Sequence, residues 1–253
     1  MEKKKSHIHG ILSSDWSECL SPTGPFDFIA FNLPQLEPVL NEIFRSYTGN
    51  RISLGEAGLR IKKILPGPVT TDMMDAYLDQ AFTVYRGVPE LIEWCLSHGI
   101  LFMINTTAMI GYFQRVFAKG LLPRVPVLSA NPLIRFAASG TDPGDVYELN
   151  ETRDKGKNTA AVVQHFGIPA GRIVVMGDSG GDGPHFEWAA RAGAFIIGSM
   201  TKHSLSSYCR DRDISIRLRF GVSYGEGEGR DVEKENRFDF MDLVEPLQAI
   251  LKR

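Results

Sequence analysis

The stretch Ile173-Val-Val-Met-Gly-Asp178-Ser-Gly-Gly-Asp182-Gly-Pro-His-Phe-Glu-Trp-Ala-Ala190 decides the fold of this chain. It opens with an apolar run, Ile173 to Met176, that lacks polar alternation. Such a run is typical of a strand buried on both faces, and therefore of a parallel sheet. Open parallel sheets bind ligands beyond the carboxyl ends of their strands. Two aspartates, Asp178 and Asp182, follow the run in a glycine-rich turn, just before a helix pattern.

These two aspartates have two interpretations. Their carboxylates are hard oxygen ligands of the kind that Mg²⁺ prefers, and a strand end suits a metal site. Alternatively, Asp178 is a turn residue and Asp182 caps the following helix, which has Pro184 in its first turn. Other residues of the chain lie at the same edge of the predicted sheet, and they decide between the metal-ligand and the capping interpretation.

Three further apolar segments have the pattern of buried strands, and helix patterns lie between the strands. The strand segments are Gly10 to Leu12, Ile100 to Ile104 and Val125 to Leu128. The clearest helix patterns are Val88 to His98 and Lys157 to Phe166. A glycine, typical of a helix C-terminus, follows each helix pattern. This alternation predicts a Rossmann-like α/β core, in which helices flank a parallel sheet.

Residues from about Phe26 to Tyr85 show a different pattern. Their apolar residues recur at helical spacing, prolines interrupt them, and no strand pattern occurs. We therefore expect a smaller, all-helical domain at residues 23–85, inserted after the first strand. The core domain then consists of residues 1–22 and 86–253. Late in this core, Ile214 to Phe220 alternates as a half-exposed strand does, and an amphipathic helix from about Phe240 to Leu251 closes the chain.

Composition and charge exclude several classes of protein. The 253 residues carry a formal net charge of −2 with both signs interspersed, which gives no electrostatic footprint for a nucleic acid partner. The three cysteines are scattered without metal-ligand spacing, which suits a reducing cytosol. No apolar signal core follows the basic start, and the longest apolar run is too short to cross a bilayer. We therefore expect a cytoplasmic protein with no nucleic acid or membrane partner.

Polar residues that suit phosphoryl chemistry occur near three other strand ends. Asp15 follows the first strand; its carboxylate could attack phosphorus, or it is a turn or cap residue. Thr106 and Thr107 follow the second predicted strand, where a hydroxyl could donate to a phosphate oxygen or cap a helix. Lys155 lies at the start of the helix before the last buried strand. It could neutralise a phosphoryl oxygen, or it is a solvated surface lysine.

The four segments resemble the motifs of the haloacid dehalogenase (HAD) superfamily of hydrolases. They occur in the same order along the chain: Asp, then Thr, then Lys, then Gly-Asp-x-x-x-Asp. The resemblance covers roughly residues 8–20 and 84–200. The helical insertion lies where that family has its helical cap. The resemblance implies a Mg²⁺-dependent phosphatase that acts on a small phosphorylated metabolite through an aspartyl-phosphate intermediate.

The resemblance also implies a role for each motif residue. Asp15 becomes the nucleophile, and Lys155 becomes the charge that steadies the aspartyl phosphate. Thr106 becomes a hydrogen-bond donor to the phosphoryl group, with Thr107 beside it and Lys155 completing the substrate-binding set. Mg²⁺ would be held by Asp15, the backbone carbonyl of Ser17 and Asp178, with Asp182 supporting it from alongside.

The first motif departs from the family pattern. HAD phosphatases usually read Asp-x-Asp-Gly-Thr, in which the second aspartate protonates the leaving oxygen and later activates water. Here the segment reads Asp15-Trp-Ser17-Glu18-Cys19, so a serine replaces the acid. A serine hydroxyl is a far poorer proton donor than a carboxylic acid, and general acid–base catalysis contributes ~10²–10⁴-fold.

This departure leaves three alternatives open. The chain could be a C–P or carbon–halogen hydrolase of the same superfamily, because these branches do not need the second aspartate. In the phosphonate branch a cap lysine forms a Schiff base, and Lys62 and Lys63 are the candidates in the insertion. The chain could instead be a catalytically weak member that binds a phosphorylated ligand. Finally, Glu18 could carry the proton in place of the missing acid.

Overall fold

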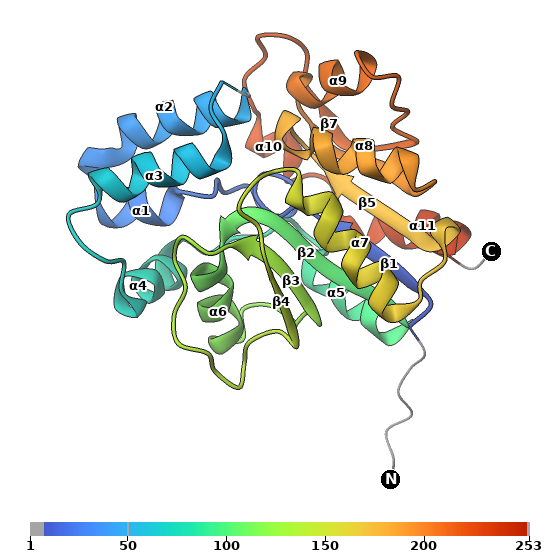
Figure 1. Cartoon of the computed structure of the whole chain (residues 1–253), viewed down its shortest axis with the longest axis horizontal. Coiled ribbons are helices and arrows are strands. Elements are labelled where there is room, and N and C mark those ends of the chain that lie inside the picture. Colours follow the sequence, from blue (N-terminus) through green and yellow to red (C-terminus); the bar gives the residue numbers. More distant parts are fainter. Residues whose placement is uncertain (1–7, 50, 252–253) are drawn as a thin grey trace.

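A single parallel sheet forms the centre of the computed structural model, which describes residues 8–49 and 51–251. Within these residues, seven strands lie in the order β4-β3-β2-β1-β5-β6-β7, and every neighbouring pair is parallel. The strands are β1 (Gly10–Ser14), β2 (Ile100–Met109), β3 (Val127–Asn131), β4 (Asp145–Glu148), β5 (Ile173–Gly177), β6 (Phe195–Thr201) and β7 (Leu218–Ser223). Helices flank the sheet (Figure 1), so the predicted Rossmann-like α/β class is confirmed.

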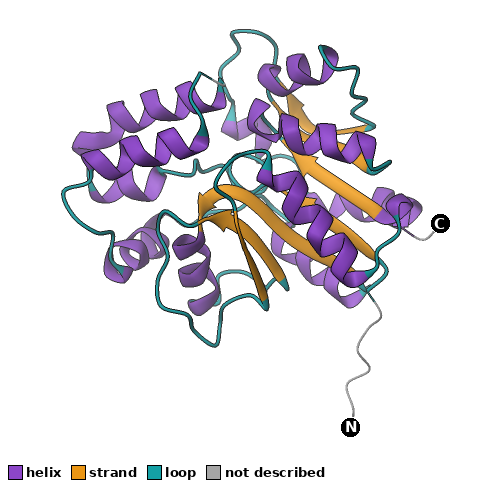
Figure 2. Ribbon diagram, viewed as in Figure 1, coloured by secondary structure: helices purple, strands orange, loops and turns teal. Residues whose placement is uncertain are grey.

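The uninterrupted apolar runs form strands because both faces of the sheet are buried. Side chains of a strand alternate between faces, so Ile11 and Leu12 of β1 belong to two separate apolar clusters. The cluster of Ile11 includes side chains of α7 (Asp154–Phe166), α8 (Gly183–Arg191) and α9 (His203–Arg210). The cluster of Leu12 includes side chains of α5 (Val88–Ser97), α6 (Ile110–Ala118) and α11 (Val244–Leu251). Figure 2 shows the resulting layers of helix, sheet and helix.

Residues 27–81 are helical and lie between β1 and α5. They form α1 (Asp27–Asn32), η1 (Pro34–Leu36), α2 (Glu37–Thr48), α3 (Leu54–Ile64) and α4 (Thr71–Ala81). The prolines explain the interruptions, since Pro34 and Pro38 lie in first turns, where a missing N–H costs little. Ser53 and Thr70 cap α3 and α4 by accepting backbone N–H groups. The insertion is in contact with the core through α2, which packs against the short helix η3 (Gly180–Asp182) after β5.

The sequence patterns failed at several elements, each for a physical reason. β4 is a short, partly exposed edge strand, and two small residues interrupt the apolar run of β6, so neither strand was predicted. β3 begins two residues later than predicted. The alternating segment forms a strand only from Leu218 onwards, because Ile214 and Ile216 pack against the apolar cluster of α8 and α9. The predicted last helix divides into η4 (Phe240–Leu243) and α11.

Two smaller helices complete the described part of the chain. These are η2 (Ala170–Arg172), which leads into β5, and α10 (Val232–Glu235), which follows β7. Among the described residues, no helix combines the length and the apolar character needed to cross a membrane.

Candidate active site

Lys155 links two aspartates at the centre of the carboxyl edge of the sheet. Its Nζ lies 2.9 Å from Asp15 Oδ2 and 2.5 Å from Asp182 Oδ1. Asp15 directly follows β1, the central strand, and Lys155 lies in the first turn of α7. Lys155 is only 1% exposed, so its interpretation as a solvated helix-start lysine is wrong. A buried ammonium needs partners of opposite charge, and the two carboxylates supply them.

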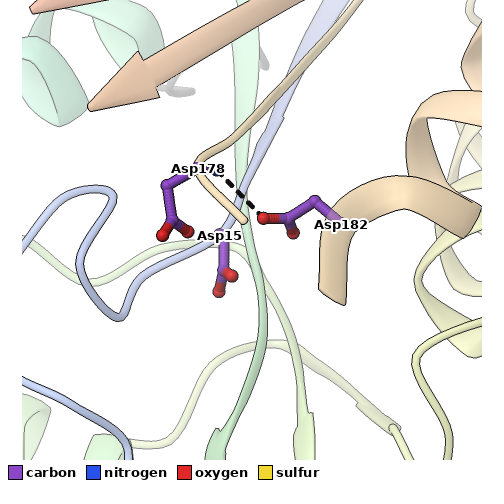
Figure 3. A group of neighbouring side chains, drawn as sticks. All are labelled: Asp15, Asp178 and Asp182. Carbon is purple, nitrogen blue, oxygen red and sulfur yellow. Dashed lines mark hydrogen bonds between the residues drawn. The ribbon is translucent and has the colours of Figure 1, made fainter. Parts of the chain in front are cut away.

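Asp182 is held by the turn in which it lies. Its Oδ2 accepts hydrogen bonds from the backbone N–H of Asp178 at 3.0 Å (Figure 3) and of Ser179 at 3.2 Å. Gly177 makes this arrangement possible, because a Cβ at that position would lie 2.5 Å from Asp182 Cγ. The capping interpretation was therefore partly right: Asp182 closes a capping box with Ser179 on η3, and its other oxygen faces Lys155.

Asp178 carries the least satisfied buried group of the site. It is 1% exposed, and its Oδ1 has no hydrogen-bond partner. Its Oδ2 lies 2.8 Å from Lys202 Nζ, an ion pair that is too poorly aligned to count as a hydrogen bond. Burial raises the pKa of Asp178 well above its ordinary value, although Lys202 opposes the rise. A buried carboxylate with an unpaired oxygen favours an added cation.

The carboxylates of Asp15, Asp178 and Asp182 converge (Figure 3), and each offers an oxygen within 4.8 Å of the others. Burial also raises the pKa of Asp15, which Lys155 counteracts. Lys155 and backbone N–H groups engage the oxygens of Asp182, and Lys155 and the N–H of Trp16 engage those of Asp15. Asp178 is therefore the carboxylate of the three whose oxygens accept no hydrogen bond. Hard carboxylate oxygens in a buried, electron-rich pocket fit a divalent ion such as Mg²⁺.

Glu18 belongs to a second charge cluster beside the aspartates. Its carboxylate forms ion pairs with Lys202 and, at 2.6 Å, with Arg230 Nη1. Arg230 also contacts the buried Glu235 at 2.5 Å. Burial opposes ionisation of Glu18, but Lys202 and Arg230 together lower its pKa. Glu18 is therefore held as a carboxylate between two cations, which argues against a proton-carrying role.

The backbone of Glu18 has a conformation that glycine usually adopts. Glu18 has a φ of 60°, in the left-handed region that side chains other than glycine seldom adopt. The ion pairs with Lys202 and Arg230 offset the strain of this conformation. Ion pairs thus hold the left-handed turn that follows Asp15 at a residue that is not glycine.

Ser17 and Cys19 occupy the other altered positions of the first motif. Ser17 is 8% exposed, and its buried Oγ has no hydrogen-bond partner. Cys19 is fully buried, and both burial and the nearby aspartates raise the pKa of its thiol well above the ordinary value. A thiol in this state is a packing group and a poor nucleophile. In this loop Asp15 contributes a carboxylate, and Ser17 contributes a neutral hydroxyl.

Thr106 and Thr107 lie inside β2, which is longer than predicted, and both are buried. The helix after β2 is capped at Met109, so their interpretation as a helix N-cap is wrong. Thr106 Oγ1 accepts from the N–H of Ala108 at 3.2 Å, and its own proton stays available to a ligand. Thr107 Oγ1 lies 2.7 Å from the hydroxyl of Tyr47, a residue of α2 in the insertion.

A buried polar network beneath the site positions Lys155. Asn105 Nδ2 lies within hydrogen-bonding distance of the Lys155 carbonyl (2.9 Å), Thr159 Oγ1 (2.9 Å) and Ser13 Oγ (3.2 Å). Thr159 also contacts His185 Nε2 at 3.0 Å. Burial, and then the charge of Lys155, lower the pKa of His185 to about 3, so this imidazole is neutral. The network ties α7 to the central strands and was not predicted, because its members carry no motif.

Residues of the insertion and of the core together line two cavities near Ser17 and Glu18. A cavity of about 10 Å³ lies beside Ser17, and aromatic side chains of both the core and the insertion line it. A second cavity, of about 150 Å³, is lined by Glu18 and Arg230 together with residues of α1 and α2. The candidate Schiff-base residues Lys62 and Lys63 are instead exposed on α3. The structure therefore does not bring either lysine into the site.

No family model matches this chain, and no curated protein matches it in sequence. Solved structures do match its fold. A substrate-bound phosphoserine phosphatase shares 17% identity with a TM-score of 0.66, and the match covers 97% of this chain and 99% of that one. A phospho-aspartyl intermediate analogue of phosphoserine phosphatase shares 15% identity with a TM-score of 0.64, over 94% of this chain and 98% of the other.

A HAD family hydrolase from Salmonella enterica serovar Typhi matches with 15% identity and a TM-score of 0.62. That match covers 96% of this chain and 71% of the hydrolase. At these identities the similarity concerns the fold. The seven-stranded parallel sheet and the order of the four motifs agree with it. The chain therefore has the fold of phosphoserine phosphatase and of HAD family hydrolases.

Proposed function

We propose that this protein is a Mg²⁺-dependent phosphatase of a small phosphorylated metabolite, and that it works through an aspartyl-phosphate intermediate. The observation that carries the proposal is the convergence of Asp15, Asp178 and Asp182, with the buried ammonium of Lys155 between Asp15 and Asp182. Lys202 pairs with Asp178 from the other side. Such a buried cluster of charges has no structural use that an apolar core would not serve better. The fold shared with phosphatases supports the same reading.

In this proposal each residue has a defined task. Asp15, at the end of the central strand, presents a carboxylate oxygen to the phosphorus atom. Lys155 neutralises charge on Asp15 and on the transferring group, and Thr106 donates its free hydroxyl proton to a phosphoryl oxygen. Asp15, the Ser17 carbonyl and Asp178 would hold the cation, with Asp182 in support. Mg²⁺ there would supply positive charge that lets two anions approach each other.

The insertion has the place and the helical make-up of a cap over this site. We assign residues 23–85 to the cap domain and residues 1–22 and 86–253 to the core domain. The contact of α2 with η3 and the small cavities between the two support the division. A cap of this kind encloses the reacting group and excludes water, which favours a small substrate over a macromolecule. The cytoplasm, where such metabolites occur, remains the expected location.

The rival reactions have less support in the geometry. A Schiff-base route needs a buried amine near the substrate, whereas Lys62 and Lys63 are exposed. A ligand-binding member without activity is favoured by one observation, the loss of an acid at Ser17. It does not explain why Asp15 keeps its contact with Lys155.

A phosphoester panel tests the proposal. Wild-type protein is incubated with Mg²⁺ and with chemically varied monoesters, and phosphate release is measured beside Asp15→Asn and a metal-free control. We expect turnover that needs both Mg²⁺ and Asp15. If no ester is hydrolysed and Asp15→Asn is indistinguishable from wild type, the phosphatase proposal is wrong. The ligand-binding alternative would then replace it.

A further inference from the structure

Tyr47 is a cap residue whose side chain reaches into the proposed active site. It lies near the C-terminal end of α2 and is 5% exposed. Its hydroxyl lies 2.7 Å from Thr107 Oγ1, at the end of β2. A Cβ at Gly181, in the turn after β5, would lie 3.6 Å from the same hydroxyl oxygen. The hydroxyl of Tyr47 therefore lies between β2 and the turn that follows β5.

The sheet order places Asp15 beneath this hydroxyl. β1 lies between β2 and β5, and Asp15 is the first residue after β1. A group that lies between β2 and the turn that follows β5 stands above the end of the strand between them. The charges of Lys155, Asp15 and Asp182 all act on the ionisation of Tyr47, as this placement requires. Tyr47 thus faces the nucleophile from the cap, the side on which a leaving group would lie.

We infer that Tyr47 supplies the general acid and base that the first motif lacks at Ser17. The inference rests on the proposed phosphatase activity and adds to it a catalytic residue from the cap. Ser17 offers only a neutral, unpartnered hydroxyl. A phenol is intrinsically a stronger acid than an aliphatic hydroxyl, although burial raises the pKa of Tyr47 and so weakens it as a donor. The hydrogen bond with Thr107 fixes the direction in which the phenol points.

The two half-reactions balance with this assignment. In the first, a carboxylate oxygen of Asp15 bonds to phosphorus, the bond from phosphorus to the ester oxygen breaks, and Tyr47 gives its proton to that oxygen. The alcohol leaves neutral, and Tyr47 becomes a phenolate. In the second, water bonds to phosphorus and gives a proton to the phenolate, while the bond between phosphorus and Asp15 breaks. Phosphate leaves, and both residues regain their starting states.

Burial and the charge of Lys155 act in opposite directions on the phenolic proton of Tyr47. Burial raises its pKa above the ordinary value, so the phenol is protonated at neutral pH, as a donor must be. Lys155 opposes that rise, because its ammonium stabilises a phenolate. The same lysine therefore serves both the phosphoryl group and the residue that exchanges the proton.

The test compares Tyr47→Phe with wild type on two kinds of ester. p-Nitrophenyl phosphate has a leaving group that needs no protonation, whereas an ester of a primary alcohol needs it. The alcohol ester is the one that wild type hydrolyses fastest in a set that includes O-phosphoserine and glycerol 3-phosphate. We expect kcat/KM of Tyr47→Phe to fall ~10²–10⁴-fold on the alcohol ester and by less than ~10-fold on p-nitrophenyl phosphate.

The second half-reaction gives an independent readout. With p-nitrophenyl phosphate, Tyr47→Phe should release a burst of p-nitrophenol and then slow down, because the phosphorylated enzyme accumulates when no base activates water. Adding Ser17→Asp should restore turnover of the alcohol ester far more in the Tyr47→Phe background than in wild type. Tyr147→Phe, on β4 and away from the site, is the matched control for loss of a tyrosine hydroxyl.

The outcomes separate the inference from the proposed function. A loss that is equal for both esters would show that Tyr47 only binds or positions the substrate, and an unchanged rate would remove it from the reaction; either overturns the inference. Retained turnover of p-nitrophenyl phosphate shows that the variant is folded. If wild type itself hydrolyses no ester, the phosphatase proposal fails, independently of Tyr47.

Discussion

Replacing Lys155 with methionine removes the one cation that two buried carboxylates share. The ammonium contacts Asp15 at 2.9 Å and Asp182 at 2.5 Å, and the side chain is 1% exposed. Methionine keeps much of the volume but leaves both carboxylates without their shared cation, with only backbone N–H groups as partners. Removing one member of a buried ion pair costs about 3–5 kcal/mol, because the remaining charge is uncompensated. We expect the free energy of unfolding of Lys155→Met to fall by about this amount at neutral pH.

Lys157→Met is the matched control, two residues further along the same helix. Its side chain is 66% exposed and pairs with Asp154 at 2.9 Å. Exposed pairs of this kind contribute about 0–1 kcal/mol. Urea unfolding followed by circular dichroism measures both variants against wild type, and metal-free buffer keeps Mg²⁺ from compensating for the lost charge.

The pH dependence of the deficit has a defined sign. Burial raises the pKa of Asp15 and Lys155 opposes this rise, so the pKa rises further in Lys155→Met. A carboxyl whose pKa is higher in the folded than in the unfolded state contributes most at low pH, and the contribution is lost as pH rises through the folded pKa. The deficit should therefore shrink between pH of about 7 and about 5. If Lys155→Met loses less than about 1 kcal/mol of unfolding free energy at neutral pH, or if the loss does not change with pH, Lys155 is not the buried counter-charge of these carboxylates.

Three further predictions concern the turn from Gly177 to Asp182 and Lys202 beside it. Gly177→Ala places a Cβ 2.5 Å from Asp182 Cγ, so its free energy of unfolding in urea should fall by about 1–3 kcal/mol. Gly171→Ala is the control: its Cβ meets no atom within 4 Å, and its free energy of unfolding should change by less than about 0.5 kcal/mol. Mg²⁺ should raise the melting temperature more at pH of about 7.5 than at about 5.5, because burial raises the pKa of Asp178 and protons compete with the cation. If Mg²⁺ raises the melting temperature of Asp178→Asn by the same amount, the metal binds elsewhere. Lys202→Met removes an ammonium 2.8 Å from Asp178 Oδ2 and with it a positive charge that competes with the cation. Calorimetric titration should therefore show that Mg²⁺ binds at least ~10-fold more tightly. Weaker binding would mean that Lys202 supports the site.

The strands that the sequence predicted are those with both faces buried. β1, β2 and β5 form the centre of the sheet. Helices cover both faces of these strands, so successive side chains are apolar on both faces. β4 lies at the edge and is partly exposed, so its pattern does not differ from that of a loop. Ile214 and Ile216 alternate like a strand yet pack from an irregular segment, since alternation alone does not specify backbone pairing.

The charged motif residues could be predicted because Asp15 and Asp178 directly follow strands, and Lys155 and Asp182 lie where helices begin. Strand order then brought Asp15, Lys155, Asp178 and Asp182 together, as the parallel sheet required. Tyr47, Lys202 and Arg230 could not be predicted in the same way. They come from the insertion, from the end of an unpredicted strand and from the loop after β7, and only the folded chain places them beside the first motif.

The measurement that tests the central claim most directly is the capture of a phosphoryl group on Asp15. Wild-type protein is mixed with Mg²⁺ and a monoester that it hydrolyses, quenched with acid, digested, and analysed by mass spectrometry. The peptide that contains Asp15 should carry one phosphoryl group that hydroxylamine removes, as expected for an acyl phosphate. Asp15→Asn should carry none. Turnover in which the phosphoryl group is found on another residue, or with full activity of Asp15→Asn, would contradict the account.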